Sequence, residues 1–238
     1  MMRWREILHD DRRREHEAWL FRQGTGDGRL VLEGEDLSAA QLRGATFQRA
    51  KFSNVNLTGA SITYAEWADA ELIDCFATNA ILIYGTFRGA TLTRCRFISS
   101  DFRRTSFSRG RIERCDFSDS IFAEAHFVNA SLRDVVFRGA GLLDTQLDKA
   151  HFERCDFSNS GLREGTAFAS HFEDCDFRGA WFDNRRLADA VFTRCKFHGM
   201  TGMPTVEGSV TLIDPDLSVN GDGSGIVSPD EILKLWRP

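Results

Sequence analysis

Six cysteines are the residues of this chain whose type could support metal or redox chemistry. Their spacing argues against both, because no pair forms a C-x-x-C motif and every gap between them is a multiple of twenty residues. Thiols stacked at such a period run parallel and do not face each other, which is unsuitable for a disulfide. We therefore predict that six reduced cysteines are small core residues: Cys75, Cys95, Cys115, Cys155, Cys175 and Cys195.

The segment NGDGSGIVSPDE, residues 220–231, resembles the calcium loop of an EF-hand. The positions that would supply oxygen ligands are Asn220, Asp222, Ser224 and Glu231. Asn replaces the usual first aspartate of that motif, and no clear helix precedes the loop. The alternative is a glycine-rich turn leading into a helix that Ser228 and Glu231 begin with a capping box. Calcium is the one cofactor that the sequence suggests.

The histidines give little support for catalysis. Only His151 and His171 are twenty residues apart, and the other four are scattered. The chain contains no G-x-S-x-G motif and no glycine-rich phosphate loop. We therefore predict that the protein is not an enzyme.

A period of five residues organises most of the chain. In residues 31–200, cut into 34 blocks of five, the second residue is Leu, Ile, Phe or Trp in all but two blocks and accounts for 17 of the 20 Phe. The fifth residue is almost always small. This period fits neither an α-helix nor a β-strand, so each block must be a short extended piece that ends in a corner. Since the cysteines recur every twenty residues, four blocks make one coil.

Phrases such as RGATF, TGASI and VNASL resemble the A-(D/N)-L-x-x motif of the pentapeptide repeat family, and the blocks continue without insertion over about 70% of the chain. The resemblance implies an all-β solenoid, a right-handed quadrilateral β-helix with the second and fifth residues of each block inside. The spacing agrees with this fold and gives about eight coils of four pentapeptides. The stretches HFERCDF and HFEDCDF, twenty residues apart, then lie side by side.

Three blocks depart from the pattern. FATNA (76–80) and TAFAS (166–170) place Phe one position away from the inward one, which Ala77 and Ala167 take instead. WFDNR (181–185) puts Arg185 where a small inward residue belongs. Because burial of an unpaired guanidinium is costly, we expect a local bulge that turns Arg185 outward.

An open β-helix exposes its core and unpaired backbone at both ends, so both ends need a cap. We predict a helical N-terminal cap over 1–29, the repeat domain over 30–200 and a C-terminal cap with a short helix over 201–238. The apolar candidates for contacts in these caps are Trp4, Ile7, Leu8, Trp19 and Leu20, then Ile232, Leu233, Leu235 and Trp236. In the Qnr and MfpA branch of the family a C-terminal element forms the dimer, so the resemblance makes a homodimer through this segment a further candidate.

The outward positions carry an uneven charge. Residues 86–114 are rich in arginine with a net charge of +6, whereas residues 115–184 have a net charge of −7. The rod is therefore bipolar along its axis, and a partner with complementary charges is expected. The acidic column that could meet such a partner is Asp116, Asp156 and Asp176.

An apolar patch is the second outward feature. Under the block pattern four residues of this patch point outward, three of them on one face: Tyr64, Ile81, Ile83 and Tyr84. Exposed apolar clusters of this kind are typical of interfaces.

These features favour a non-catalytic protein–protein interaction module, because repeats build long surfaces instead of pockets. The Qnr- and MfpA-like branch of the family implies a partner, DNA gyrase or topoisomerase IV, which the rod would engage by mimicking duplex DNA and so protect from topoisomerase poisons. The alternative is a generic scaffold or structural repeat protein with another partner.

Composition excludes several other classes. The net charge of −5 argues against direct nucleic-acid binding, and no apolar stretch is long enough to cross a membrane. The first twenty residues are charged throughout and lack the apolar core of a signal peptide. We expect a cytoplasmic, bacterial protein.

Overall fold

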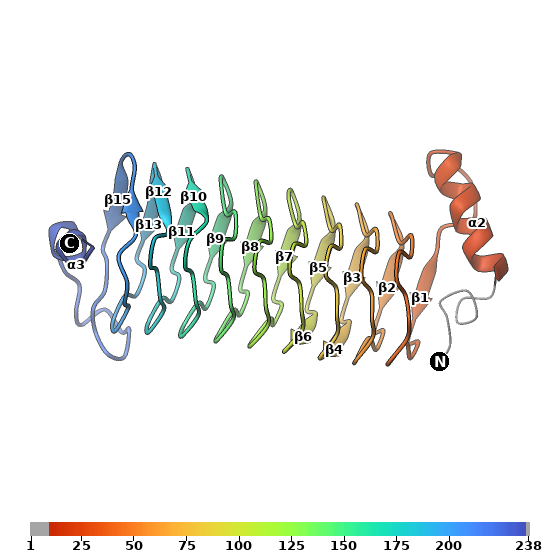
Figure 1. Cartoon of the computed structure of the whole chain (residues 1–238), viewed down its shortest axis with the longest axis horizontal. Helices are drawn as coiled ribbons and strands as arrows, with labels where there is room; N and C mark the ends of the chain where they lie inside the picture. The colour runs from red at the N-terminus through yellow and green to blue at the C-terminus, as the bar shows by residue number, and fades with distance from the viewer. Residues whose placement is uncertain (1–9, 237–238) are drawn as a thin grey trace.

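The computed structural model of the chain describes residues 10–236 and stacks the five-residue blocks as coils along a rod (Figure 1). Backbone pairing joins residues twenty positions apart, so that Lys51 lies beside Glu71 and Glu71 beside Thr91. Four blocks therefore complete one coil. The β-solenoid predicted from the sequence is confirmed.

The corners of the coils follow from one left-handed residue in every block. All positive-φ residues other than glycine, except Gln23, are the fourth residue of a block, such as Asn54 at 53° and Asp74 at 54°. In many blocks the N–H of the fifth residue then donates to the carbonyl of the second, as Ala60 does to Leu57 at 3.0 Å. A left-handed residue that reverses the chain every five positions is the physical origin of the period.

One side of the rod is a continuous parallel sheet. Its ten strands, in spatial order, are β1 (Val31–Glu33), β2 (Lys51–Ser53), β3 (Glu71–Ile73), β5 (Thr91–Thr93), β7 (Arg111–Glu113), β8 (Ser131–Arg133), β9 (His151–Glu153), β11 (His171–Glu173), β13 (Ala190–Thr193) and β15 (Val210–Ile213). We call this side the sheet face.

The remaining sides pair less continuously. A three-stranded sheet contains β10 (Thr166–Phe168), β12 (Arg186–Ala188) and β14 (Thr205–Val206), and a two-stranded sheet contains β4 (Phe76–Thr78) and β6 (Arg96–Ile98). Elsewhere the coils are joined by single parallel bridges such as Ile121↔Gly141.

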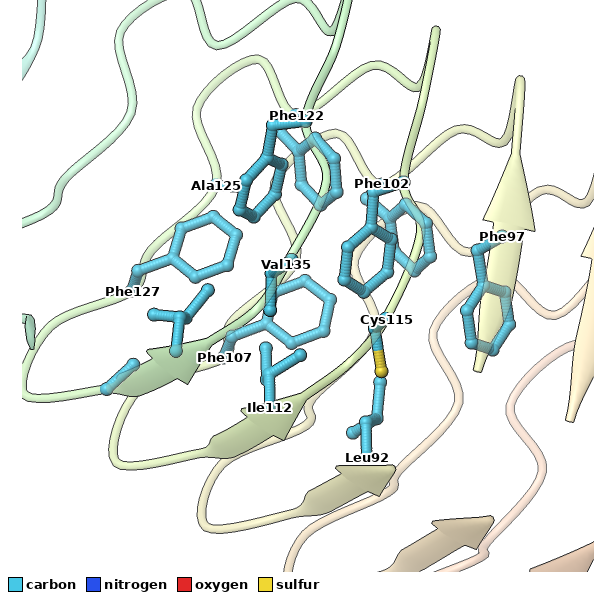
Figure 2. Packing of buried hydrophobic residues seen from close by; sticks show 14 of the residues in the cluster. Leu92, Phe97, Phe102, Phe107, Ile112, Cys115, Phe122, Ala125, Phe127 and Val135 are labelled. Carbon is cyan, nitrogen blue, oxygen red and sulfur yellow. The ribbon is translucent and has the colours of Figure 1, made fainter. Parts of the chain in front are cut away.

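The core is a set of stacked aromatic ladders. The Phe102 and Phe122 rings lie 5.0 Å apart with planes 2° from parallel, and Phe137 stacks on Phe157 at 5.1 Å. Figure 2 shows several of these rings inside the coils together with the small residues Cys115 and Ala125. Identical residues stack well because each meets its copy one coil away.

All six cysteines are buried and free, as the spacing predicts. Their thiols donate to backbone carbonyls of the neighbouring coil, as Cys195 does to Phe172 at 3.3 Å. Burial raises the pKa of the Cys155 and Cys175 thiols well above the ordinary range. These residues act as small core residues.

Two of the three irregular blocks keep the regular path. Ala77 and Ala167 occupy the inward position and are buried, while Phe76 and Phe168 are half-buried on the outside. The third block contradicts our expectation, because Arg185 is fully buried and no bulge turns it outward.

Arg185 is buried because backbone carbonyls replace a counter-ion. Its guanidinium donates to the carbonyl oxygens of Leu142 and Leu162, both at 2.9 Å, and of Thr145 at 2.6 Å. Gly165, one coil earlier in the same column, lets its backbone lie close against the preceding coil, since an added Cβ there would lie 2.2 Å from the Thr145 oxygen. Burial lowers the Arg185 pKa to about 9, so the group still carries its charge at neutral pH.

Helix α2 (Asp10–Phe21) covers the first coil (Figure 1). His16 and Trp19 are buried, and the Leu30 N–H donates to His16 Nδ1 at 3.0 Å. The guanidinium of Arg12 donates to the Val31 carbonyl at 2.6 Å. The helix thus satisfies backbone groups that the first coil would otherwise leave unpaired. Trp4, Ile7 and Leu8 of the predicted cap lie outside the described residues.

The solenoid continues past the boundary that we predicted at residue 200. Strand β14 pairs with β12 nineteen residues earlier, and β15 then pairs with β13 twenty residues earlier. The chain is therefore one residue short at 201–206 and recovers its spacing by Val210. Coil pairing ends at Asp216, which bridges Lys196 on one side and Ile226 on the other.

Helix α3 (Pro229–Leu235) covers the last coil (Figure 1). The predicted capping box is present, with the Glu231 carboxylate accepting from the Ser228 N–H at 2.8 Å. Ile232 and Trp236 are buried, and the Trp236 ring packs 5.9 Å from Phe197 and 6.0 Å from Phe192. Ile232 and Trp236 are therefore used within the chain itself, and the Leu235 side chain lies outside the part that the structure describes.

Candidate protein-interaction face

Exposed apolar side chains gather on the side of the rod two corners away from the sheet face. This side consists of the blocks that begin at residues 41, 61, 81 and so on to 181, followed by 201–203, and bridges such as Ser61↔Ile81 and Gly161↔Trp181 join them. Of 13 large hydrophobic residues exposed within 10–236, seven lie here: Tyr64, Ile81, Tyr84, Ile121, Leu143, Trp181 and Met203. We call this side the apolar face.

The N-terminal half of the apolar face contains the patch that the sequence predicts. Tyr64 and Tyr84 are exposed and stack with ring centroids 4.7 Å apart. The Arg43 guanidinium lies 4.6 Å above the Tyr64 ring, and Arg104 lies 5.5 Å from the Tyr84 ring and also donates to its hydroxyl. Ile81 and Ile83 complete the patch. All four predicted residues share this face, where the sequence analysis placed only three.

The C-terminal half of the face was missed by the sequence analysis. Ile121, Leu143 and Trp181 are exposed along it, and the Arg163 guanidinium lies 4.2 Å above the Trp181 ring. The signal was available, because these residues occupy outward positions of blocks that begin at multiples of twenty from residue 81. An outward apolar residue indicates a binding face only when it is compared with the residues twenty positions before and after it, which lie beside it on the neighbouring coils.

Charged residues flank the apolar side chains in an ordered way. Arg104 forms an ion pair with Glu124 at 2.8 Å, which holds the pKa of that carboxyl below its usual range. The next two residues of the same column, Asp144 and Glu164, are exposed, and no ion pair to either is present within 10–236. Acidic charge therefore accumulates beside the C-terminal half of the apolar side chains.

The predicted aspartate column exists but is already engaged. Bridges place Asp156 beside Asp176 on the side between the sheet face and the apolar face. Each aspartate accepts the N–H two residues ahead, at 2.9 Å from Ser118 to Asp116 and 2.9 Å from Ser158 to Asp156. Asp156 also pairs with Arg138, and Asp176 with Arg178. These carboxylates stabilise corners of the coil and are largely neutralised by arginines of their own face.

The acidic excess of residues 115–184 is spread around the rod. Its 13 acidic residues fall on three sides in nearly equal numbers, with Asp148 alone on the fourth. The arginine-rich segment is likewise distributed, and half of its arginines pair within the chain: Arg94 with Asp74, Arg103 with Asp101, Arg104 with Glu124 and Arg111 with Glu113. The bipolar charge of the sequence is therefore not a single charged stripe.

No deep cleft accompanies these surfaces in the part of the chain that the structure describes. The depression between Arg138, Arg178 and His198 encloses about 440 Å³ but is shallow and open. His151 and His171 lie side by side on the sheet face with ring centroids 6.3 Å apart, and the described residues near them add no third metal-ligating side chain. The arrangement offers surface for binding and little shelter for a reaction.

Two of the predicted calcium ligands already accept hydrogen bonds from the chain itself. Glu231 accepts hydrogen bonds from Ser228 as a helix cap, and Asp222 accepts the Ser224 N–H at 3.0 Å. Within residues 10–236 no group of three or more His, Cys, Asp or Glu side chains could hold a metal ion. Calcium at residues 220–231 stays a prediction of the sequence. A calcium-dependent rise in melting temperature that Asn220→Ala abolishes would support it.

Stacked coils with a repeated inward pattern define the molecule as a β-solenoid repeat protein. Residues 90–168 match the family profile described as a pentapeptide repeat region, and residues 36–76, 70–109 and 170–201 match the profile for pentapeptide repeats. The chain belongs to the pentapeptide repeat family.

Several solved pentapeptide repeat structures are similar to this chain. QnrB1, described as a plasmid-mediated fluoroquinolone resistance protein, is 18% identical over 77% of this chain and 90% of its own, with a TM-score of 0.38. HetL, involved in heterocyst differentiation regulation in the cyanobacterium Nostoc sp., is 17% identical over 94% and 99%, with a TM-score of 0.37. A protein of the Arabidopsis thaliana thylakoid lumen is 20% identical over 57% and 70%, with a TM-score of 0.23. Identities of this size concern the fold alone.

A search of curated proteins gave no match. Within the described residues, neither α2 nor α3 has the length and apolar character needed to cross a bilayer.

Proposed function

We propose that this chain is a non-catalytic protein–protein interaction module that binds its partner through the apolar face. The observation that carries the proposal is the line of seven exposed apolar side chains on one side of the rod. Soluble proteins rarely leave such a line uncovered, and a solenoid presents it as a long, rigid surface.

The residue types on this face support a protein partner. Tyr, Trp and Arg are enriched at the centres of protein interfaces, and here three arginines lie over aromatic rings: Arg43 on Tyr64, Arg104 on Tyr84 and Arg163 on Trp181. These contacts hold long side chains in place before binding, so less conformational entropy is lost when a partner arrives.

The test is capture of a partner from an extract of the source cells, using the wild-type chain and matched variants. Tyr64→Ser with Trp181→Ser removes the two largest anchors of the apolar face, whereas Val31→Ser with Ile213→Ser removes exposed apolar residues from the sheet face. We expect the captured protein to be lost at least tenfold from the first variant and retained by the second. Equal loss from both, or no captured protein at all, would reject the apolar face as the binding surface.

A type II topoisomerase bound by DNA mimicry is the second candidate function. The net charge of −7 over residues 115–184 supports it, because a groove built for DNA attracts acidic surfaces. It ranks below the first because the acidic residues are spread over several sides and because Asp156 and Asp176 are paired with Arg138 and Arg178.

Asparagine variants separate charge from structure in a topoisomerase test. Asp156→Asn with Asp176→Asn keeps an oxygen that can accept the N–H two residues ahead and removes two charges. If the topoisomerase proposal holds, the wild-type protein protects gyrase or topoisomerase IV from a poison at micromolar concentration and the variant protects less. Absence of any effect by the wild-type protein leaves the scaffold with another partner as the function.

A further inference from the structure

We propose that the apolar face binds a second copy of this chain, with the two rods antiparallel. The inference rests on the proposed function in one respect, namely that the apolar face is a binding surface. It adds the identity and the orientation of the partner.

The charge pattern along the face is complementary to itself. The N-terminal half carries three basic residues and one acidic residue: Arg43, Arg103, Arg104 and Asp101. The C-terminal half exposes four acidic residues and one basic residue, Glu124, Asp144, Glu164, Asp183 and Arg163, while a second basic residue, Arg185, is buried beneath it. One half is thus net positive and the other net negative, although both halves expose apolar side chains. Arg103 pairs with Asp101 and Arg104 with Glu124 within the chain, so the charges left without an ion pair among the described residues are Arg43 in one half and Arg163, Asp144, Glu164 and Asp183 in the other.

This pattern selects one orientation of the two rods. A parallel pair would set each coil against its own copy, so that Arg104 meets Arg104 and Asp144 meets Asp144. An antiparallel pair sets the positive half of each rod on the negative half of the other and brings Arg104 toward Asp144. The Arg43 side chain extends over Tyr64, one coil along, so its guanidinium also comes toward Asp183. Like charges at a contact cost free energy and opposite charges fix the alignment, so the antiparallel arrangement is favoured.

The apolar side chains match under the same operation. With the two-fold axis near the block that begins at residue 121, Ile121 meets its own copy and Tyr64 comes near Trp181. Both rods then contribute the same patch to the contact, as a closed two-fold dimer requires. A dimer of this kind closes on itself and leaves no free apolar face for further growth.

The size of the face is sufficient for a stable dimer. Three outward positions in each of eight coils, from residue 41 to residue 184, approach the roughly 20–30 residues per partner of a standard interface. At about 4.8 Å per coil the contact would run for roughly 40 Å along the rod.

The ends of the rod compete poorly for the same role. Helix α2 satisfies the first coil through His16 and Arg12, and helix α3 buries Ile232 and Trp236 on the last coil. The homodimer through the C-terminal element, which the family resemblance suggested, could not use Ile232 and Trp236 without uncovering the last coil of its own chain.

Sedimentation equilibrium of the full chain across micromolar concentrations measures the proposed dimer. We expect reversible dimerisation that weakens as salt rises, because opposite charges align the rods. Ile121→Lys should weaken it at least tenfold, since the axis brings two such lysines together. The control is Ile213→Lys on the sheet face, which changes an equally exposed isoleucine, 44% against 46%, and should leave dimerisation unchanged.

A charge exchange tests the orientation. Arg43→Glu with Arg104→Glu should be monomeric, and so should Asp144→Lys with Asp183→Lys. An equimolar mixture of these two variants should form heterodimers, because every reversed charge then meets its opposite. A parallel dimer, or one built elsewhere, would not regain association on mixing, and that result overturns the proposal.

The outcomes separate this inference from the proposed function. A wild-type chain that stays monomeric at all concentrations overturns the dimer. If that monomer still captures another protein through Tyr64 and Trp181, the interaction function stands with a different partner. A dimer that Ile121→Lys leaves intact overturns the assignment of the dimer to the apolar face.

Discussion

The sheet face and the apolar face are built on the same five-residue backbone, yet they treat their outward residues in opposite ways. On the sheet face the fourth residues of successive blocks form ion pairs between coils: Arg94 with Asp74 at 2.7 Å, Arg154 with Asp134 at 2.6 Å and Arg194 with Asp174 at 2.7 Å. On the apolar face the corresponding column contains Tyr64, Tyr84 and Arg104 toward the N-terminus, and then Glu124, Asp144 and Glu164. The sheet face pairs several residues of this column between coils, whereas the apolar face pairs Arg104 with Glu124 and leaves Asp144 and Glu164 without an ion pair among the described residues.

This difference shows where function can arise in a solenoid. The inward residues and the corners determine the fold, so the outward residues of any one side are free to vary. A side whose charges are paired between coils offers a partner little, because its ion pairs would have to be broken or desolvated. A side with ordered aromatic residues and unpaired carboxylates offers both apolar area and charge.

The largest expected effect tests whether the two faces share one interior. Phe122 lies behind the apolar face and Phe152 behind the sheet face, and both rings are buried in stacked ladders. The two variants are Phe122→Ala and Phe152→Ala. Each truncation should lower the free energy of unfolding by about 3–5 kcal/mol, as for other buried Phe. Denaturant unfolding measures this. A cost below about 1 kcal/mol on either side would mean that the faces do not share a common core.

The second prediction concerns the buried arginine at a corner of the apolar face. Arg185→Met leaves the buried Leu162 carbonyl without its donor and should cost about 1–3 kcal/mol through that unsatisfied acceptor. The Leu142 and Thr145 carbonyls keep the Thr145 hydroxyl and the Thr166 N–H as donors. The control is Arg186→Met, whose guanidinium is exposed and pairs with Glu207. Both variants are measured by denaturant unfolding. An Arg185→Met variant as stable as the wild type would show that the Leu162 carbonyl does not need this donor.

The sequence predicts the interior and the coil because they depend on a strict repetition. Phe and Cys recur at fixed positions. If these positions are buried in every block, the only arrangement that fits is a coil of four blocks. Arg185 was misplaced because its acceptors come from residues 19 to 43 positions away, and no local pattern reveals that carbonyls will converge there. The close approach of two coils that Gly165 allows is visible only once the coils are stacked.

The C-terminal boundary and the binding face were harder for related reasons. One residue is missing between Thr201 and Val206, so counting by five failed, although Leu212 and Leu217 again occupy the inward spacing. The patch at Tyr64 and Tyr84 was found because its members are close in sequence. Its extension to Trp181 was missed because it exists only as a line along the axis of the rod.

The third prediction concerns the end of the rod, which neither face covers. Burial lowers the pKa of His16, whose Nδ1 accepts the Leu30 N–H and must be unprotonated to do so. The unfolded chain therefore binds this proton more readily, so the stabilisation is present above the ordinary histidine pKa of about 6.5 and is lost as pH falls below it. The melting temperature should fall between pH 7 and pH 5, and less so in His16→Gln than in the control His126→Gln. Identical pH profiles would remove His16 from the cap's stability.

The smallest expected effect separates the two faces most sharply. Arg154→Gln breaks the ion pairs of Arg154 with Asp134 and Glu153 on the sheet face, and these groups are exposed enough for salt and water to screen them. Near neutral pH the melting temperature should change by only a few degrees, and dimerisation and partner capture should not change.

The hydrogen bond from Arg154 holds the pKa of Asp134 below its usual range, so the stabilisation is present above the ordinary aspartate pKa and is lost as pH falls through the lowered value. The difference in melting temperature between wild type and Arg154→Gln should therefore vanish in acid. Trp181→Ser on the apolar face should do the reverse, leaving the melting temperature nearly unchanged and weakening association. If Arg154→Gln weakened association as much as Trp181→Ser, the sheet face would be part of the interface and the contrast between the two faces would fail.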